Sequence, residues 1–226
     1  MSDRYAKRKK EGAWEHILQT GKYRLTTPDP LVGERLREFH TIKKGAYLDL
    51  GCGLGRHLDV PECGLCIGLD SSMSALNAVR SRINPSIQLV RASMTQLPFC
   101  SESIDTILAW RSIYLLKIDQ IECAINELYR VLCYGGCLLC SVRATTNTLY
   151  HTGREQGEQI EPGTFLFPEE EFHGAMYHFF SEDEIRQRFH KFEINKLQCR
   201  ELEHTSFTVN RPQYKNNFWI FSARKF

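Results

Sequence analysis

The chain has 226 residues, 42% of them apolar, which is enough to bury the core of one domain. Its formal net charge of +2 is too small to indicate a nucleic-acid or membrane surface. The sequence shows no apolar run of membrane-spanning length and no apolar stretch of the kind that follows the charges of a secretory signal. We therefore expect a cytoplasmic protein without membrane contact.

Nine cysteines are present, and Cys63 and Cys66 form a C-x-x-C pair. The sequence offers no obvious second pair at the spacing that a structural zinc requires, so we expect no metal site. Cysteine also packs as a small apolar residue, and we expect reduced thiols. The basic residues between positions 4 and 10 fit a solvated, frayed terminus better than a nucleic-acid contact.

Residues 1–43 are predicted to form two amphipathic helices around a turn at residues 21–28. The apolar residues that indicate the helices are Trp14, Ile17, Leu18, Leu31, Leu36 and Phe39.

A glycine-rich stretch, L-D-L-G-C-G-L-G at residues 48–55, follows directly on a strand predicted over residues 46–50. Alternate glycines let the backbone turn sharply and approach a ligand. A second apolar run at residues 65–69 ends at Asp70, 19 residues after Gly51. This interval is typical of a nucleotide bound across neighbouring parallel strands, with the acid on the ribose hydroxyls. The third glycine falls at Gly55, one position too early for a dinucleotide loop, which argues against an NAD(P)-dependent oxidoreductase.

Further predicted elements follow at regular intervals. A helix begins near Ser72, strands cover residues 87–90, 104–110 and 137–142, and apolar residues recur at helical spacing over residues 119–132. The motifs among them are L-P-F at 97–99, S-I-D at 103–105 and E-L-Y-R-V-L-C-Y-G-G at 127–136. Together with the glycine loop, this series over residues 46–143 resembles the class I S-adenosylmethionine (SAM)-dependent methyltransferases.

The resemblance implies an α/β fold with a doubly wound, seven-stranded, mostly parallel sheet and a reversed last hairpin from residues 192–200 and 217–224. It implies a single domain over residues 1–226. Its parts would be an N-terminal helical lid (1–43), a SAM-binding core (44–143), a substrate cap between strands five and six (144–180), and a C-terminal helix and strand hairpin (181–226).

The resemblance also implies SAM as the cofactor. Asp49 would hold the amino group of its methionine part, and Asp70 would bind the ribose, although a helix cap is the structural alternative for Asp70. Many relatives carry an Asp at the adenine position, where this chain has Ser93, and a hydroxyl accepts a weaker hydrogen bond than a carboxylate. The predicted cofactor-binding residues are Asp49, Gly51, Cys52, Gly53, Gly55, Asp70, Ser71, Ser93, Met94, Trp110 and Arg24.

Residues 144–180 look loop-like, first acidic and then aromatic, and a connection of this length with little structure is uncommon unless it is functional. Such a cap suits an apolar or cationic small molecule. Its ending, H-F-F-S-E-D-E-I at 178–185, resembles a branch of small bacterial-type methyltransferases with a histidine-bearing cap, and Ser181 should open the next helix in a capping box. The predicted substrate-binding residues are Arg111, Tyr114, His173, Tyr177 and His178.

Tyr114 and His178 are the candidate catalytic bases, required only if the acceptor arrives protonated. The structural alternatives are a buried, hydrogen-bonded histidine for His178 and a surface ion pair for Arg111. We expect a SAM-dependent methyltransferase with a small-molecule acceptor. The alternatives are a tRNA or protein methyltransferase, and a non-catalytic methyltransferase-like partner or activator subunit, which the departure at Ser93 supports. The sequence names neither the acceptor atom nor the oligomeric state.

Overall fold

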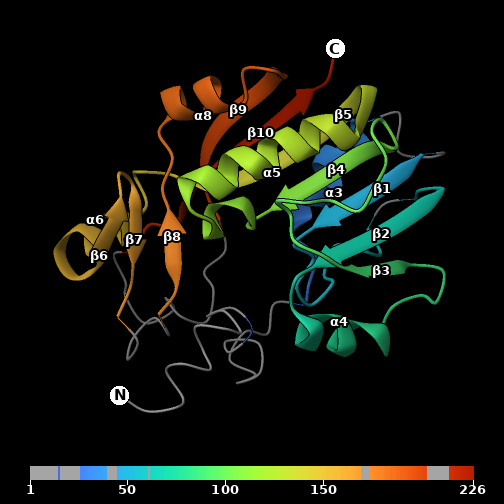
Figure 1. The fold of residues 1–226 in the computed structure, drawn as a ribbon, viewed down its shortest axis with the longest axis horizontal. Coiled ribbons are helices and arrows are strands. Elements are labelled where there is room, and N and C mark those ends of the chain that lie inside the picture. Colours follow the sequence, from blue (N-terminus) through green and yellow to red (C-terminus); the bar gives the residue numbers. More distant parts are fainter. Residues whose placement is uncertain (1–14, 16–25, 40–44, 61, 169–173, 203–213) are drawn as a thin grey trace.

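The computed structural model describes residues 15, 26–39, 45–60, 62–168, 174–202 and 214–226 (Figure 1). The helices are α3 (Pro30–Arg37), α4 (Met73–Arg80), α5 (Ile118–Val131), α6 (Thr148–Gln156) and α8 (Glu182–Arg188), and η2 (Ile113–Leu115) is a short 3-10 turn. The strands of the main sheet are β1 (Ala46–Leu50), β2 (Leu65–Asp70), β3 (Gln88–Arg91), β4 (Ile104–Trp110), β5 (Leu132–Arg143), β9 (Glu193–Glu201) and β10 (Asn217–Arg224). A smaller sheet contains β6 (Glu158–Glu161), β7 (Thr164–Leu166) and β8 (Met176–His178).

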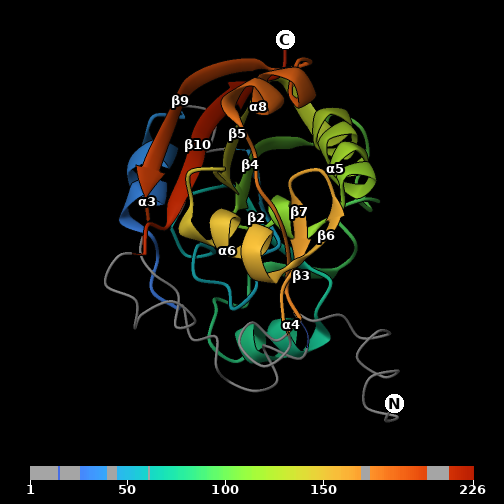
Figure 2. The ribbon, with the colours of Figure 1, turned by 90° about the vertical axis from the view of Figure 1, so that its left-hand side faces the viewer.

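The main sheet has the order β3-β2-β1-β4-β5-β10-β9, and β10 runs antiparallel to both of its neighbours. Helices α3 and α5 lie on opposite faces of this sheet (Figure 2). The predicted seven-stranded, mostly parallel, doubly wound fold is therefore confirmed. The predicted strands lie within two residues of the observed ones, except that β5 begins five residues earlier, at Leu132.

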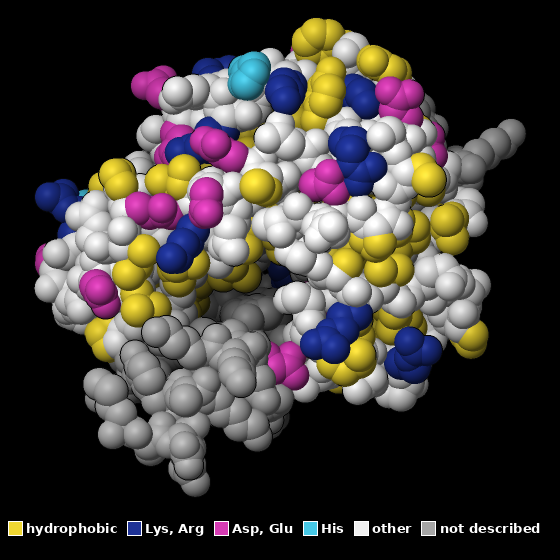
Figure 3. Space-filling model, in the orientation of Figure 1, with side chains coloured by type: hydrophobic (Ala, Val, Ile, Leu, Met, Phe, Trp, Pro, Cys, Tyr) yellow, Lys and Arg dark blue, Asp and Glu magenta, His cyan; other side chains and the backbone are white. Residues whose placement is uncertain are grey.

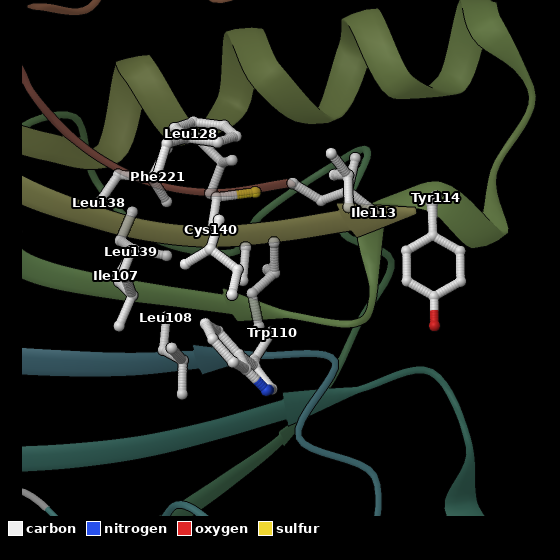
Figure 4. Close-up of a cluster of buried hydrophobic side chains, with 14 of the residues drawn as sticks. Ile107, Leu108, Trp110, Ile113, Tyr114, Leu128, Leu138, Leu139, Cys140 and Phe221 are labelled. Carbon is white, nitrogen blue, oxygen red and sulfur yellow. The ribbon is translucent and has the colours of Figure 1, made fainter. Parts of the chain in front are cut away.

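The core forms because β1, β4 and the second part of β5, from Cys137, are mainly apolar and buried. From α5, an apolar stripe that includes Ile121, Ile125 and Leu128 packs onto the sheet. Figure 4 shows Leu128 of this helix above side chains of β4, β5 and β10, with the hydroxyl of Tyr114 pointing away from the cluster. The core thus fixes the carboxyl ends of the parallel strands, where ligands bind in open α/β sheets.

The segment between β5 and β9 is more structured than expected. It contains α6 and the antiparallel sheet β6-β7-β8, so the prediction of a loop-like cap was wrong. Strands of three or four residues give too little alternation to be recognised from sequence. We call residues 148–168 and 174–178 the cap; it stands beside the end of the sheet to which β1, β2 and β4 point (Figures 1 and 2).

His178 ties the cap to α8. Its Nδ1 lies 2.7 Å from Thr164 Oγ1 of β7, and its Nε2 lies 3.0 Å from Glu184 Oε1 of α8. The predicted helix cap at Ser181 is present, because its hydroxyl accepts from the Glu184 N–H at 3.2 Å. The described contacts of the Glu184 carboxylate are with His178 and Arg188, so the second half of the capping box is replaced by a link to the cap.

The N-terminal lid is described only in part. Helix α3 begins at the N-cap Asp29, with Pro30 at its first position, and confirms the second predicted helix. The first predicted helix lies outside the described residues, apart from Glu15. All nine cysteines are free, and the described part of the chain holds no cluster of potential metal ligands. No described helix is long and apolar enough to cross a membrane.

Candidate functional site

The glycine loop turns at the carboxyl end of β1. Gly51, Gly53 and Gly55 have φ angles of +74°, +52° and +72°, a region that side chains with a Cβ rarely adopt. A Cβ on Gly55 would lie 2.8 Å from Val79 Cγ1 of α4, so this glycine permits close packing of the loop against the helix. A Cβ on Gly53 would meet nothing within 4 Å, which leaves its backbone open to a ligand.

Asp49 is a buried carboxylate at the end of β1, 2% exposed. Its Oδ2 has no hydrogen-bond partner among the described residues. Burial raises the pKa of Asp49 to about 7, although the guanidinium of Arg56 acts in the opposite direction. Arg56 is buried as well, and its Nη1 also has no described hydrogen-bond partner. Such buried groups are costly unless a ligand pairs with them.

Asp70 binds the glycine loop to the start of α4. Its Oδ2 accepts from the Gly53 N–H and its Oδ1 from the Ser72 N–H, both at 2.8 Å. Burial raises the pKa of Asp70, while these backbone donors lower it. Ser72 is the helix cap, since its hydroxyl accepts from Ala75 N at 3.0 Å. Asp70 therefore fixes the loop geometry and still lies on the surface that a ribose would meet.

The predicted adenine position is on the segment after β3. Ser93 is exposed, and its hydroxyl lies 2.7 Å from Thr95 Oγ1 and accepts from Thr95 N at 3.2 Å. This local turn fixes the orientation of the Ser93 side chain, and the hydrogen bonds described for it involve no charged group. Met94 is half-buried beside it and approaches the glycine loop, where its Cε would lie 3.5 Å from a Cβ on Gly51.

Three buried polar side chains connect the lid to the loop and to β4. Trp110 Nε1 donates to Asp29 Oδ2 at 3.3 Å, and Asp29 N donates to His57 Nε2 at 3.2 Å. Burial, together with Arg56 and Arg111, lowers the pKa of His57 to about 2, so the ring is neutral and its proton is on Nδ1. The sequence had pointed to Trp110 but not to His57.

These elements enclose a cavity of about 190 Å³ at the carboxyl edge of the sheet. Figure 3 shows that this face of the molecule is hollowed between the cap and the sheet. The predicted cofactor residues that line the cavity are Asp49, Gly51, Cys52, Gly53, Asp70, Ser71, Ser93, Met94 and Trp110. Gly55 lies behind the loop against α4, and Arg24 is outside the described residues.

Other residues line the cavity that sequence reasoning did not place there. They are Leu54, Arg56, His57, Leu69 and Ala92. Ser112, Leu115 and Leu116 also line it, from the turn after β4. Arg56 and His57 directly follow the glycine loop, and this adjacency was the signal that could have revealed them.

Arg111, predicted to bind substrate, lines the same cavity directly after β4. Its φ of +56° is unusual for a residue with a side chain, and its N–H donates to Ser141 Oγ of β5 at 2.9 Å. The guanidinium carbon lies 5.1 Å from the centre of the Phe218 ring. A strained backbone and a buried cation thus occur together at the edge of the candidate site.

The other predicted substrate residues lie beyond the cavity wall. Tyr114 and Tyr177 come together between η2 and the cap, with ring centres 5.9 Å apart, and they are 5% and 6% exposed. His178 is 1% exposed and does not line the cavity. His173 is outside the described residues.

Two glycine variants test whether the cavity binds SAM. Gly53→Ala and Gly135→Ala both place a Cβ in open space at positive φ, of +52° and +73°. Each should lower the free energy of unfolding by about 1–2 kcal/mol. Gly53 lines the cavity whereas Gly135 does not, so only Gly53→Ala should lose affinity for S-adenosylhomocysteine (SAH) in calorimetry. Equal SAH affinity of the two variants would contradict the assignment of the loop.

Comparison with known proteins agrees with the geometry. A family model described as "Methyltransferase domain" matches residues 48–136, which span the glycine loop to the start of β5. No curated protein sequence gives a significant match to the chain.

Solved structures share the fold. A SAM-dependent methyltransferase from Methanosarcina mazei is 19% identical, with 88% of this chain and 99% of that chain covered and a TM-score of 0.69. A SAM-dependent methyltransferase from Thermotoga maritima, described as a possible histamine N-methyltransferase, is 20% identical, with 95% and 99% covered and a TM-score of 0.63. A chain in the complex that contains the Trm112 methyltransferase activator of Haloferax volcanii is 16% identical, with 93% and 96% covered and a TM-score of 0.61.

The family match includes the residues that form the floor of the cavity, and the sheet has the strand order and the reversed strand of the class I methyltransferases. The loop with open space over Gly53 and the unpartnered oxygen of Asp49 fit SAM as the cofactor. Residues 48–136 thus match a methyltransferase domain, and the chain has the fold of the class I SAM-dependent methyltransferases.

Proposed function

We propose that the chain transfers the methyl group of SAM to a small-molecule acceptor bound between the carboxyl edge of the sheet and the cap. The observation that carries this proposal is the cavity of about 190 Å³ at this edge, which Arg111 and, from η2, Leu115 line. Tyr114 of η2 contacts Tyr177 of β8, so the cap packs next to this wall. An acceptor bound against the wall would be enclosed on several sides. An enclosed site favours a small molecule over a polymer.

The buried polar atoms of the cavity match the head group of an amino acid. Asp49 Oδ2 would accept from the ammonium of the methionine part of SAM, and Arg56 Nη1 would donate to its carboxylate. Asp70 would meet the ribose, while Ser93 and Met94 would flank the adenine. SAM supplies an electrophilic methyl group on its sulfonium. The task of the chain is to align an acceptor with that group and to exclude water, and alignment contributes about 7–11 kcal/mol in favourable cases.

The geometry separates the two candidate bases. Both ring nitrogens of His178 are engaged, with Thr164 and Glu184. We assign His178 a structural role as the link between the cap and α8. Tyr114 remains the candidate base, because its hydroxyl points out of the hydrophobic cluster (Figure 4).

One observation supports the alternatives to a small-molecule methyltransferase, and two observations oppose them. The likeness to a chain from the Trm112-containing complex favours an activator-dependent methyltransferase or a partner subunit. Against a polymer acceptor stands the buried position of Tyr114 and Tyr177. Against a non-catalytic subunit stands the complete glycine loop with Asp49 and Asp70 around one cavity.

Transfer of a labelled methyl group tests the proposal. The full chain is incubated with methyl-labelled SAM and, in separate reactions, a metabolite extract, total tRNA or total protein. We expect label in the metabolite fraction, none with Gly53→Ala, and retained transfer with Gly135→Ala. Label in tRNA or protein would replace the proposal by the polymer alternative. SAH binding without transfer to any fraction would favour the non-catalytic subunit.

The variants His178→Gln and Tyr114→Phe separate structure from chemistry. His178→Gln should lower the free energy of unfolding by about 1–3 kcal/mol, because it disrupts buried hydrogen bonds. Its turnover, measured on folded protein with the acceptor fraction identified above, should change only a few-fold. Loss of a general base costs about 100-fold or more, which we expect for Tyr114→Phe if the acceptor arrives protonated. A loss of that size in His178→Gln at unchanged stability would make His178 the base.

A further inference from the structure

Arg143, the last residue of β5, is a buried cation without a described carboxylate partner. It is 4% exposed, its Nη1 is 3.4 Å from Asn216 Oδ1, and its side chain also hydrogen-bonds with that of Tyr214. Its Nε is buried and has no hydrogen-bond partner among the described residues. Burying a charge without an opposite charge is costly, and chains seldom retain such a residue without a use for it.

Aromatic rings surround this guanidinium. Its carbon lies 4.6 Å from the ring centre of Tyr177 and 5.1 Å from those of Tyr114 and Phe218. The three rings come from the cap strand β8, the turn η2 and strand β10. Cation–π attraction offsets part of the cost of burial, but an aromatic face cannot pair with the buried Nε–H as an anion can.

The position of Arg143 relates it to the methyl acceptor. Phe218 is shared, since the guanidinium carbon of Arg111 also lies 5.1 Å from its ring centre. Arg111 lines the cofactor cavity, so Arg143 stands one aromatic ring beyond the cavity wall. Tyr114 and Tyr177, which the proposed function places beside the acceptor, contact it directly.

The described acidic residues of the cap do not offset this charge. Glu155 and Glu158 are exposed, and the half-buried Glu161 accepts from the Ile118 N–H at 2.6 Å and from Thr164 Oγ1 at 3.2 Å. The expectation of a cationic acceptor rested on the glutamates of this segment. In the described part of the chain, the inner side of the cap meets an arginine instead.

Resting on the proposed function, we infer that Arg143 binds an anionic group of the methyl acceptor, a carboxylate or a phosphate. The guanidinium presents its Nε side to the anion, while Nη1 stays with Asn216. Tyr114 and Tyr177 would pack against a flat apolar part of the same molecule. The acceptor class is therefore a small aromatic or unsaturated acid.

Calorimetry on the full chain saturated with SAH tests this with defined probes. Benzoate and phenyl phosphate carry the two anions on a flat ring, benzamide is a neutral analogue, and benzylamine is a cation. At least one of the anions should bind at least about tenfold more tightly than benzamide and benzylamine, as expected for a charge-assisted, bidentate contact. The stronger of the two anions shows whether the site takes a carboxylate or a phosphate.

Arg143→Gln should lose about tenfold or more of the anion affinity and keep its affinity for SAH. Its Tm should stay the same or rise, because a buried cation without a described opposite charge has been removed. The matched control is Arg35→Gln. Arg35 of α3 is also buried, but its guanidinium lies 3.2 Å from Gln198 Oε1 and 3.6 Å from Glu38 Oε1. Arg35→Gln should therefore keep the anion affinity and lower the Tm.

The inference is overturned if neither anion binds better than benzamide. It is also overturned if Arg143→Gln keeps the anion affinity while its Tm falls, since Arg143 would then be a structural tie between β5 and β10. These results can be distinguished from a failure of the proposed function by the binding of SAH to the wild-type chain. If the wild-type chain does not bind SAH, the cofactor assignment falls, and the anion titrations can still be read on the ligand-free chain.

Discussion

The candidate site depends on one buried group, the carboxyl of Asp49 at the end of β1, whose charge is only partly compensated. The strand must be apolar and covered on both faces to lie in the centre of the sheet, and this burial brings Asp49 out of water. Arg56 offsets the cost only in part, so the pKa of the carboxyl rises to about 7 and Oδ2 is left without a described partner. A cationic group that pairs with this oxygen would relieve the cost, as the ammonium of SAM would in the proposed site.

Other residues of the site keep the space beside Asp49 accessible to a ligand. Asp70 uses both carboxylate oxygens to fix Gly53 and Ser72, so the loop cannot collapse into the space over Gly53. On the other side, Asp29 joins Trp110 to a neutral His57, which anchors α3 at the cavity without adding a second charge. Beyond the cavity, the cap is held by the hydrogen bonds of His178 to Thr164 and Glu184, while Arg143 keeps a positive charge on its inner side. In the proposed site, Asp49 would bind the cofactor at one end and Arg143 the acceptor at the other.

Sequence reasoning predicted what is local and missed what several distant segments build together. The strands, the glycine loop and the caps at Ser72 and Ser181 follow from periodicity and residue type, and the structure places nine of the predicted cofactor residues around one cavity. Arg56 and His57 were missed as lining residues because the direction of a side chain after a tight turn is set by tertiary packing. The small cap sheet was missed because its strands are too short for a periodic signal, and Glu184 was assigned to a capping box although its carboxylate contacts His178 and Arg188. Arg143 ends an otherwise apolar strand, and its aromatic neighbours come from η2, the cap and β10, so nothing near it in the sequence marks it.

The most direct test of the central claim is the proton balance of SAH binding between pH 5.5 and 8, measured by calorimetry in buffers of different ionisation enthalpy. Because burial raises the pKa of Asp49 to about 7, the carboxyl of the free protein is mostly protonated at pH 6 and must lose its proton to pair with the ammonium of SAH. His57, with a pKa of about 2, does not titrate in this range. We predict release of close to one proton at pH 6 and almost none at pH 8, with affinity that rises by up to about tenfold per pH unit below pH 7 and then levels off. Asp49→Asn should bind SAH weakly and with little pH dependence. Wild-type binding that releases no proton and keeps the same affinity over the whole range would contradict the account, because Asp49 would then not be the group that holds the ligand.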